Sequence, residues 1–262
     1  MVVIQALNLA SAKSFLYNQA NALADRFGYE IKPNGMRTDF EPDSGAMINR
    51  VRPYTMTTPD RIYSLIQAVR YLERAGIEGG IVECGVWRGG SMMTVALTLM
   101  GERSAQRDLY LFDTYEGMSE PEDGVDVDVG GRPASDQLAA SKRTESSWIW
   151  AYAPLEEVAR NMASTGYPQE RVHLVKGMVE DTLPAEAPEK IALLRLDTDW
   201  YASTRHSLEH LYPRLVSGGV LILDDYGHWQ GARRAFDEYA AENKLNILLN
   251  RVDTSGRIAV KP

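Results

Sequence analysis

The chain has 262 residues, of which 44% are hydrophobic and 24% charged, and its net charge is −8 at pH 7. A chain of this size can bury a substantial core, and one large α/β domain with an appendage is expected rather than two equal domains. The acidic balance and the lack of a basic stripe argue against a nucleic-acid partner, and no apolar stretch approaches the roughly 20 residues that span a bilayer.

Residues 1–58 are predicted to form an N-terminal arm, partly helical and partly irregular. The apolar residues of Val2–Phe27 are too loosely spaced for a core helix and favour packing for a lid or a dimer partner. Ile31–Thr58 contains several prolines and glycines and shows no sustained period. The first residues lack the basic region of a signal peptide, and Gln5 and Asn8 interrupt their apolar run, so a cytoplasmic protein is expected.

A helix is expected to begin at Thr58, because a threonine N-cap, a proline and an acid follow one another there, and to end at Gly76. Thr57 lies just ahead of this helix N-terminus, where hydroxyls and backbone N–H groups can meet a carboxylate. It is therefore a candidate for binding a ligand, and plain helix capping is the equal alternative. The main domain is predicted to start with this helix and to cover residues 59–262.

The segment Ile81–Ser91 is an apolar run that turns through a glycine-rich loop into a helical pattern. Gly85 lets a ligand approach the backbone, and Ser91 is expected to cap the helix. The pattern is not the dinucleotide fingerprint G-x-G-x-x-G, and Glu83 at the strand end suits a ligand with an ammonium group. S-adenosylmethionine (SAM) is such a ligand. The alternative is an ordinary glycine-rich connection.

A second buried strand, Leu109–Phe112, ends at Asp113, 30 residues after Glu83 (113 − 83). A carboxylate at this position commonly accepts from both ribose hydroxyls of a nucleotide. Residues 117–152 then break the βα rhythm and carry Trp148 and Trp150. They are predicted to form a lid over a partly apolar substrate, and a surface excursion is the alternative.

The rest of the chain continues the alternation of strands and helices. Val179 follows a predicted strand end and is a candidate contact for an adenine base. The predicted strands are Val172–Lys176, Ile191–Leu196, Val220–Leu223, Asn246–Leu249 and Arg257–Val260, with helices over Pro154–Thr165, around Leu208 and around Phe236.

Two of the buried strands end in Asp197-x-Asp199 and Asp224-Asp225. Since ligands bind at the carboxyl ends of strands in open α/β sheets, these acids are expected to converge. Close carboxylates repel unless a cation neutralises them, and Mg²⁺ suits an all-oxygen site. The alternative is that some of them cap helices or pair with Arg195 or Arg205. His228 follows closely and is a weaker candidate to face the acceptor.

Four segments together resemble the macrocin O-methyltransferase family: Glu83–Ser91, Phe112–Gly117, Leu194–Thr204 and Leu223–Tyr226. The resemblance implies a class I, Rossmann-like SAM-dependent methyltransferase fold, with a seven-stranded, mostly parallel sheet, helices on both faces and a reversed last strand. It also implies Mg²⁺ on Asp197, Asp224 and Asp225, and often a homodimer or higher homo-oligomer. Neither the lid nor the arm before Tyr54 can be matched residue by residue.

The expected activity is methyl transfer from SAM to a hydroxyl of a glycosylated natural product. The alternatives are a catechol-type enzyme acting on a small phenol and a SAM-binding protein without catalysis. Asp199 is favoured as general base, and the alternative is that Asp197 does this work while it binds the metal. The residues expected to bind the cofactor are Thr57, Glu83, Gly85, Ser91, Asp113, Val179 and Asp197.

Overall fold

The computed structural model describes residues 19–20, 23, 39–144 and 147–262. It divides into two units, Met1–Phe40 and Glu41–Pro262, and the fold below is that of the second unit. The packing role expected for Val2–Phe27 lies almost entirely outside the described residues, as does the start of the segment expected to be irregular. No helix in the described part of the chain is long and apolar enough to cross a membrane.

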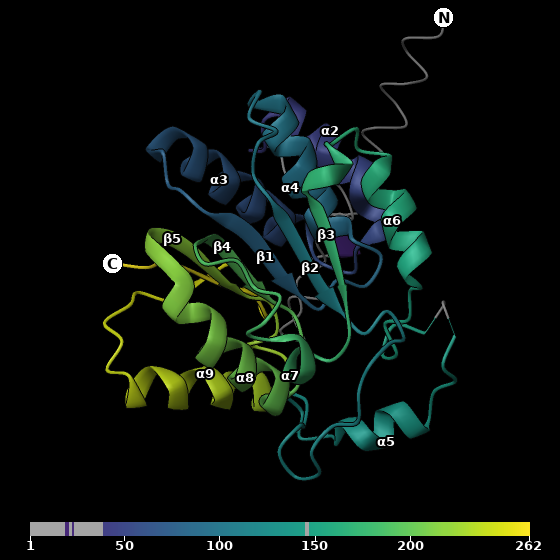
Figure 1. Cartoon of the computed structure of the whole chain (residues 1–262). Coiled ribbons are helices and arrows are strands. Elements are labelled where there is room, and N and C mark those ends of the chain that lie inside the picture. The colour runs from purple at the N-terminus through teal and green to yellow at the C-terminus, as the bar shows by residue number, and fades with distance from the viewer. Residues whose placement is uncertain (1–18, 21–22, 24–38, 145–146) are drawn as a thin grey trace, which may run out of the picture. The chain divides into compact units, whose positions relative to one another are not determined.

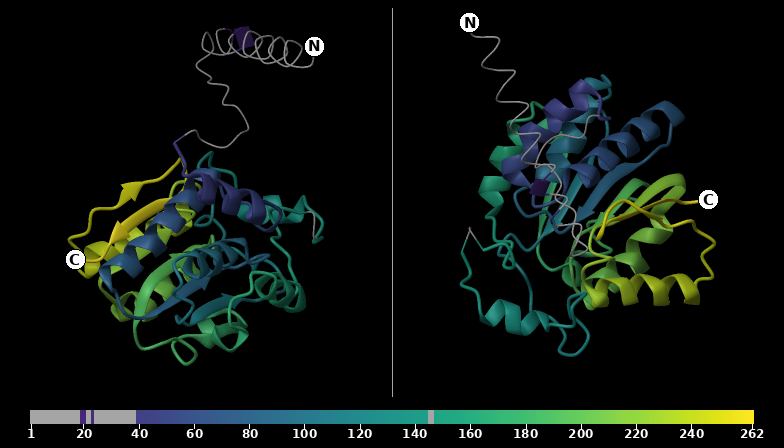
Figure 2. Two further views of the ribbon diagram at one scale, coloured as in Figure 1. Left: turned by 90° about the horizontal axis from the view of Figure 1, so that it is seen from above. Right: turned by 180° about the vertical axis from the view of Figure 1, so that it is seen from behind.

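A seven-stranded sheet forms the centre of the second unit, in the order β3-β2-β1-β4-β5-β7-β6 (Figures 1 and 2). Strands β1 to β5 run parallel, and β7 is antiparallel to both of its neighbours. This arrangement confirms the predicted fold class. The strands are β1 (Gly80–Cys84), β2 (Leu109–Asp113), β3 (Val172–Lys176), β4 (Ile191–Leu196), β5 (Leu215–Leu223), β6 (Asn250–Arg251) and β7 (Arg257–Val260).

Helices cover both faces of the sheet (Figure 1). One face carries α2 (Pro42–Val51), α3 (Pro59–Ala75), α4 (Gly90–Gly101) and α6 (Leu155–Ala163), and the other carries α7 (Val179–Thr182), α8 (Tyr201–Leu211) and α9 (Gln230–Glu242). The short helix α5 (Ala134–Ala139) belongs to the insertion after β2, and the single 3₁₀ turns are η1 (Arg52–Tyr54), η2 (Gln169–Arg171) and η3 (Tyr212–Arg214).

The local signals explain where α3 begins and ends. Thr58 is its N-cap and accepts a hydrogen bond from Arg61 N at 3.3 Å, Pro59 follows, and Gly76 closes the helix in the left-handed conformation. The inner strands β1 and β4 are buried on both faces, as the inner strands of a parallel sheet are, whereas the edge strand β3 is only partly buried. In β4 all six residues are buried, including Arg195.

Three expected elements differ from the structure. The segment expected to be irregular contains α2, because Pro42 suits a first helical turn and Ile48 and Val51 pack inward. Strand β5 begins at Leu215, earlier than expected. Asn246–Leu249 is not a strand: its alternation reflects Ile247 and Leu249 packing against the core, and only two later residues pair with β7.

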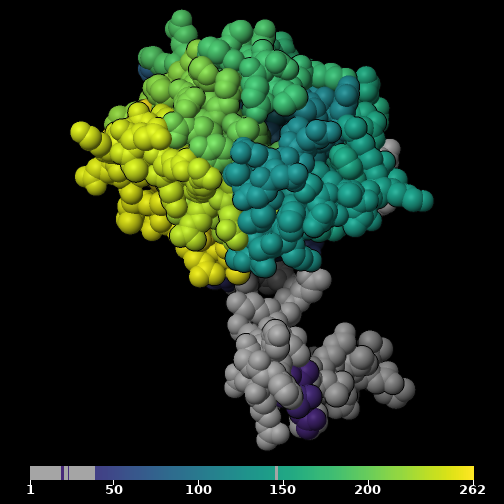
Figure 3. Space-filling view, turned by 90° about the horizontal axis from the view of Figure 1, so that it is seen from below, coloured from purple at the N-terminus to yellow at the C-terminus, as the bar shows by residue number. Residues whose placement is uncertain are grey.

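The insertion between β2 and α6 is anchored by its own small hydrophobic cluster. This cluster joins Ala134, Leu138 and Ile149 of the insertion to Trp200, Trp229 and Ala232 near the starts of α8 and α9. Isolated β-bridges pair Val127 with Pro133 and Asp128 with Trp229. In Figure 3 the teal residues of the insertion lie against the yellow-green residues of the C-terminal half.

Candidate active site

A cavity of about 360 Å³ opens at the carboxyl ends of the parallel strands. This is the position expected for a ligand in an open α/β sheet. The segment before α3 and the insertion after β2 complete its wall. It is lined by every predicted site residue except Glu83, namely Thr57, Gly85, Ser91, Asp113, Val179, Asp197, Asp199, Asp224 and Asp225.

Two glycines, Gly85 and Gly89, shape the loop after β1. Gly85 has φ 81°, and a Cβ there would overlap the carbonyl oxygen of Asp197, so a glycine lets β1 and β4 come together. The expectation that Ser91 caps α4 is wrong. Gly89, with φ 85°, is the N-cap, and Ser91 lies buried in the first turn. The left-handed conformation of Gly89 starts the helix before Ser91 is reached.

Asp113 fixes the two loops at the ends of β1 and β2. Its carboxylate accepts hydrogen bonds from Val86 N (2.6 Å), Trp87 N (3.1 Å) and Tyr115 N (2.7 Å). Burial raises the pKa of Asp113, and these N–H groups oppose the rise. The carboxylate lines the cavity where a ribose is expected, although much of its acceptor capacity already serves the backbone.

Glu83 is only 1% exposed and does not line the cavity. One carboxylate oxygen contacts Arg195, and Oε2 has no hydrogen-bond partner among the described residues. Burial raises the pKa of Glu83 to about 8, and the charge of Arg195 opposes the rise. Contact between Glu83 and the ammonium group of SAM therefore stays a prediction.

Arg195 is a buried cation that holds three carboxylates together. Besides Glu83, its guanidinium contacts Asp197 Oδ2 at 2.7 Å and Asp224 Oδ1 at 2.6 Å. Burial disfavours its charged form, but the carboxylates around it raise the pKa of Arg195 well above its usual value. The alternative that the strand-end acids pair with arginine thus holds for Arg195. Arg205 instead pairs with surface glutamates of α8 and α9.

A second arginine, Arg61 in the first turn of α3, also contacts the Asp224 carboxylate. Its Nε donates to Asp253 Oδ2 at 3.0 Å, and Thr58 Oγ1 donates to the same oxygen at 2.7 Å. Asp253 lies in the turn between β6 and β7, and Ser255 of that turn donates to the Asp224 carbonyl at 2.6 Å. The start of α3 and the β6–β7 turn therefore hold the end of β5 from two sides.

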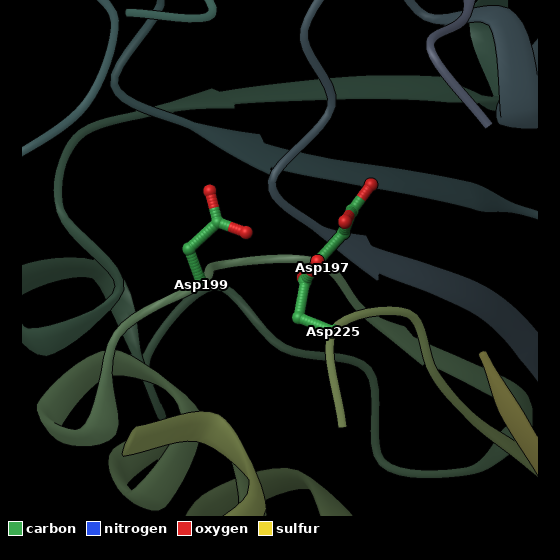
Figure 4. Close-up of side chains that lie close together, drawn as sticks. All are labelled: Asp197, Asp199 and Asp225. Carbon is green, nitrogen blue, oxygen red and sulfur yellow. The ribbon is translucent and has the colours of Figure 1, made fainter. Parts of the chain in front are cut away.

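Three carboxylates that line the cavity lie close together: Asp197, Asp199 and Asp225 (Figure 4). Oxygens of Asp197, Asp199 and Asp225 lie within 4.8 Å of one another, whereas Asp224 faces the arginines and Thr57. Asp225 Oδ2 is buried and has no partner among the residues that the structure describes. Burial and the neighbouring carboxylates raise the pKa of Asp199 and of Asp225. Carboxylate oxygens are hard ligands, and Asp225 Oδ2 is buried without a partner among the described residues. The cluster therefore fits a divalent cation such as Mg²⁺.

The backbone at Asp199 has an uncommon conformation. Its φ is 64°, and Trp200 N donates to Thr198 O at 2.7 Å, which closes a three-residue turn centred on Asp199. Such γ-turns with positive φ are rare and strained, and they persist where the surroundings enforce them. The turn presents Asp199 to the cavity between β4 and α8.

The mouth of the cavity is apolar. Met56, Trp148 and Met178 line it and are among the exposed large hydrophobic side chains of the described residues. His228 also lines the cavity, half-buried and edge-on to Trp229 with ring centroids 4.9 Å apart. Burial lowers the pKa of His228, which favours the neutral imidazole.

Sequence reasoning missed Arg61 and left Arg195 as one alternative among several. A signal for Arg195 existed: it is the one charged residue in the apolar run Ile191–Leu196, and a buried charge needs a partner. Arg61 gave no such signal, because its partner Asp253 lies 192 residues away in the chain.

Known proteins of similar sequence and structure act as O-methyltransferases. The 8-demethyl-8-(2,3-dimethoxy-α-L-rhamnosyl)-tetracenomycin-C 4'-O-methyltransferase of Streptomyces olivaceus is 32% identical over 222 residues, covering 83% of this chain and 81% of the relative. The mycinamicin III 3''-O-methyltransferase of Micromonospora griseorubida is 29% identical over 203 residues, covering 78% and 76%. The solved structure of the O-methyltransferase NovP superposes with a TM-score of 0.69 at 29% identity, covering 79% of this chain and 82% of that one.

The family described as Macrocin-O-methyltransferase (TylF) matches residues 19–259, which confirms the resemblance seen in the four sequence segments. Its match spans the strand ends, both arginines and all of the carboxylates that meet at the cavity. The chain therefore belongs to the macrocin O-methyltransferase family and is a SAM-dependent O-methyltransferase.

Proposed function

We propose that this enzyme transfers the methyl group of SAM to a sugar hydroxyl of a glycosylated natural product, and that Asp199 takes the hydroxyl proton. The observation that carries this proposal is the placement of three carboxylates in a cavity with an apolar mouth. By their names, two relatives methylate a rhamnosyl-tetracenomycin and mycinamicin III. An apolar mouth suits the non-sugar part of such an acceptor.

SAM binds, in this proposal, against the ends of β1, β2 and β3. Gly85 and Ser91 lie beside its methionine part, Asp113 beside the ribose and Val179 beside the adenine, and all four line the cavity. Thr57 closes the methionine end from the opposite wall. Methyl transfer needs the acceptor hydroxyl in line with the sulfonium methyl, and the carboxylates at the other end of the cavity are the groups that would place that hydroxyl.

Asp199 is the better general base of the two candidates. Asp197 Oδ2 is committed to Arg195 at 2.7 Å, while Asp199 has no guanidinium contact among the described residues. A base works best when its pKa lies near the working pH, and burial and Asp197 raise the pKa of Asp199 in that direction.

Mg²⁺ is held in this proposal by Asp197 and Asp225, with Asp224 as the third ligand implied by the family resemblance. When bound, the ion supplies Lewis acidity that lowers the proton affinity of a poor nucleophile. In the structure Arg61 and Arg195 contact the two oxygens of Asp224, so this carboxylate would have to exchange one of these contacts to bind the ion. The family resemblance also implies a homodimer or higher homo-oligomer. Light scattering in solution tests this expectation.

The acceptor is tested with a panel of the rhamnosyl-tetracenomycin, mycinamicin III, catechol and demethyldecarbamoylnovobiocin, which a third relative, from Streptomyces niveus, methylates by its name. Each is incubated with SAM and Mg²⁺, and S-adenosylhomocysteine release and the mass of the product are measured. Methylation of the glycosylated compounds on the sugar supports the proposal. Turnover of catechol alone supports a phenolic acceptor and contradicts it.

The base is tested with Asp199→Asn. This variant should keep its Mg²⁺ affinity by calorimetry and lose about 10²–10⁴ in turnover, the usual contribution of general-base catalysis. Asp197→Asn and Asp225→Asn should weaken Mg²⁺ binding instead. Loss of the metal in Asp199→Asn, or normal turnover of the parent enzyme in EDTA, contradicts these assignments.

A further inference from the structure

We infer that Asp126, in the insertion after β2, is a positioning residue for methyl transfer, because it caps α8 and so fixes the backbone turn that carries Asp199. The inference rests on the proposed role of Asp199. It gives the insertion a task besides the predicted one of covering the acceptor.

Asp126 is a buried carboxylate, 2% exposed, that reaches the start of α8. Its Oδ1 accepts a hydrogen bond from Tyr201 N at 2.8 Å, across a separation of 75 residues in the chain. Its Oδ2 accepts from Glu122 N at 2.8 Å, which ties the same side chain to the insertion. The N-cap of α8, Trp200, makes no side-chain cap bond, so Asp126 does the work that an Asp or Ser N-cap does in other helices.

The capped residue directly follows the strained turn. Asp199 is the centre of that turn, and Trp200 and Tyr201 are the two residues after it. The insertion holds both: Asp126 accepts from Tyr201 N, and Ser119 O accepts from the Trp200 indole at 3.0 Å. On the other side of the turn, Asp197 N donates to Cys84 O at 2.8 Å. A strained γ-turn such as the one at Asp199 persists where its surroundings enforce it.

A glycine in α9 makes room for this contact. A Cβ at Gly231, in the first turn of α9, would overlap Asp126 Oδ1 and lie 3.1 Å from Tyr201 N. The next residue of the insertion, Val127, accepts from Gln230 N at 2.9 Å. The insertion therefore satisfies the first N–H group of both α8 and α9, the helices that follow the acid-bearing ends of β4 and β5.

The inference is tested with Asp126→Ala, Asp126→Asn and Gly231→Ala, all assayed well below their melting temperatures. Asp136→Ala, an exposed carboxylate of α5, and Gly101→Ala, where a Cβ meets nothing within 4 Å, are the matched controls. Amide hydrogen exchange is measured at residues 200–201. Steady-state kinetics use the acceptor that the panel above identifies.

In Asp126→Ala, exchange at residues 200–201 should rise at least tenfold, and kcat should fall about 10²-fold with the KM for SAM little changed, because a displaced catalytic group costs about that much. Asp126→Asn keeps an oxygen that can accept from Tyr201 N, so it should recover at least tenfold in kcat. Gly231→Ala should reproduce the alanine defect. Both controls should behave as the parent.

Unchanged exchange at residues 200–201 in Asp126→Ala overturns the inference, whether or not any acceptor is turned over. An unchanged kcat, or a loss confined to the KM for the acceptor, also overturns it. In either case a large loss in Asp199→Asn leaves the proposed function standing. Normal turnover of Asp199→Asn instead refutes the proposed base, whatever Asp126→Ala does. If Asp126→Ala fails to fold, Gly231→Ala and Asp126→Asn decide by the same two measurements.

Discussion

Replacing Arg195 by methionine should destabilise the fold through one carboxylate in particular. The guanidinium contacts Glu83, Asp197 and Asp224, but these partners differ in what remains after its removal. Asp197 is 31% exposed and keeps contact with water, and Asp224 keeps Arg61. Glu83 is 1% exposed, and Arg195 supplies its side-chain hydrogen bond. The loss of folding stability should therefore come mainly from Glu83.

Above about pH 8, where Glu83 is ionised beside Arg195, removing the arginine should cost about 3–5 kcal/mol, because the carboxylate must then stay buried without compensation or take up a proton. For a domain of this size that corresponds to a fall of about 6–20 °C in melting temperature. Adding Glu83→Gln to Arg195→Met removes this buried titratable group and should restore a large part of the loss above pH 8. Arg205→Met, which breaks exposed pairs with Glu209 and Glu242, should lower the melting temperature much less.

The pH dependence gives a second measure. With Arg195 present, the pKa of Glu83 is about 8, above its ordinary value of 4.5. Without the opposing charge it lies higher still, so folded Glu83 keeps its proton where the unfolded chain has lost it. The stability that Glu83 contributes is fully present below pH 4.5 and is lost as the pH rises through the folded pKa. Because this pKa is about 8 in the parent and higher in Arg195→Met, the variant should lose more stability than the parent only above about pH 8.

The melting temperatures are measured by circular dichroism over a range of pH. The proteins compared are the parent, Arg205→Met, and Arg195→Met with and without Glu83→Gln. Equal stability of Arg195→Met and the double variant would refute the reasoning, because Glu83 would then not depend on Arg195. The same conclusion follows if Glu83→Gln leaves the loss above pH 8 in place.

Three further predictions concern the loops around the cavity. Burial raises the pKa of the Cys84 thiol to about 12, so the native protein should not react with a thiol reagent at neutral pH and should react fully in denaturant; rapid native labelling would contradict this. Gly85→Ala should lower the unfolding free energy by more than about 1 kcal/mol in denaturant titrations, since its Cβ overlaps Asp197 O, whereas Gly101→Ala should not. Asp113→Ala should weaken SAM binding roughly tenfold or more by calorimetry, and an unchanged affinity would rule out the ribose contact.

The positions of most strands could be predicted, because parallel strands are continuous apolar runs. The same logic brought the strand-end residues Asp113, Asp197 and Asp225 to one edge, which is where the structure has them. The direction of Glu83 could not be predicted. A residue at a strand end has one face toward the cavity and one toward the core, and Glu83 faces the core with Arg195.

The division of the four acids was also beyond sequence reasoning. Asp224 and Asp225 are neighbours, yet one faces the arginines and the other joins Asp197 and Asp199. That difference follows from contacts with Arg61 and Asp253, which lie far apart in the chain. The apolar residues of the insertion follow no helical or strand period. The hydrogen bond between Asp126 and the start of α8 could therefore not be predicted from the sequence.

The position of β7 has a consequence for synthesis of the protein. Strand β7 lies between β5 and β6, although the ribosome makes it after both. Until it emerges, the sheet of the nascent chain ends at β5, an open edge of apolar residues that invites pairing with other chains. The turn before β7 also brings Asp253 to Arg61 and Ser255 to Asp224. The nascent enzyme therefore cannot assemble this wall of its cavity during translation of the preceding residues, and chaperone binding should concentrate on that interval.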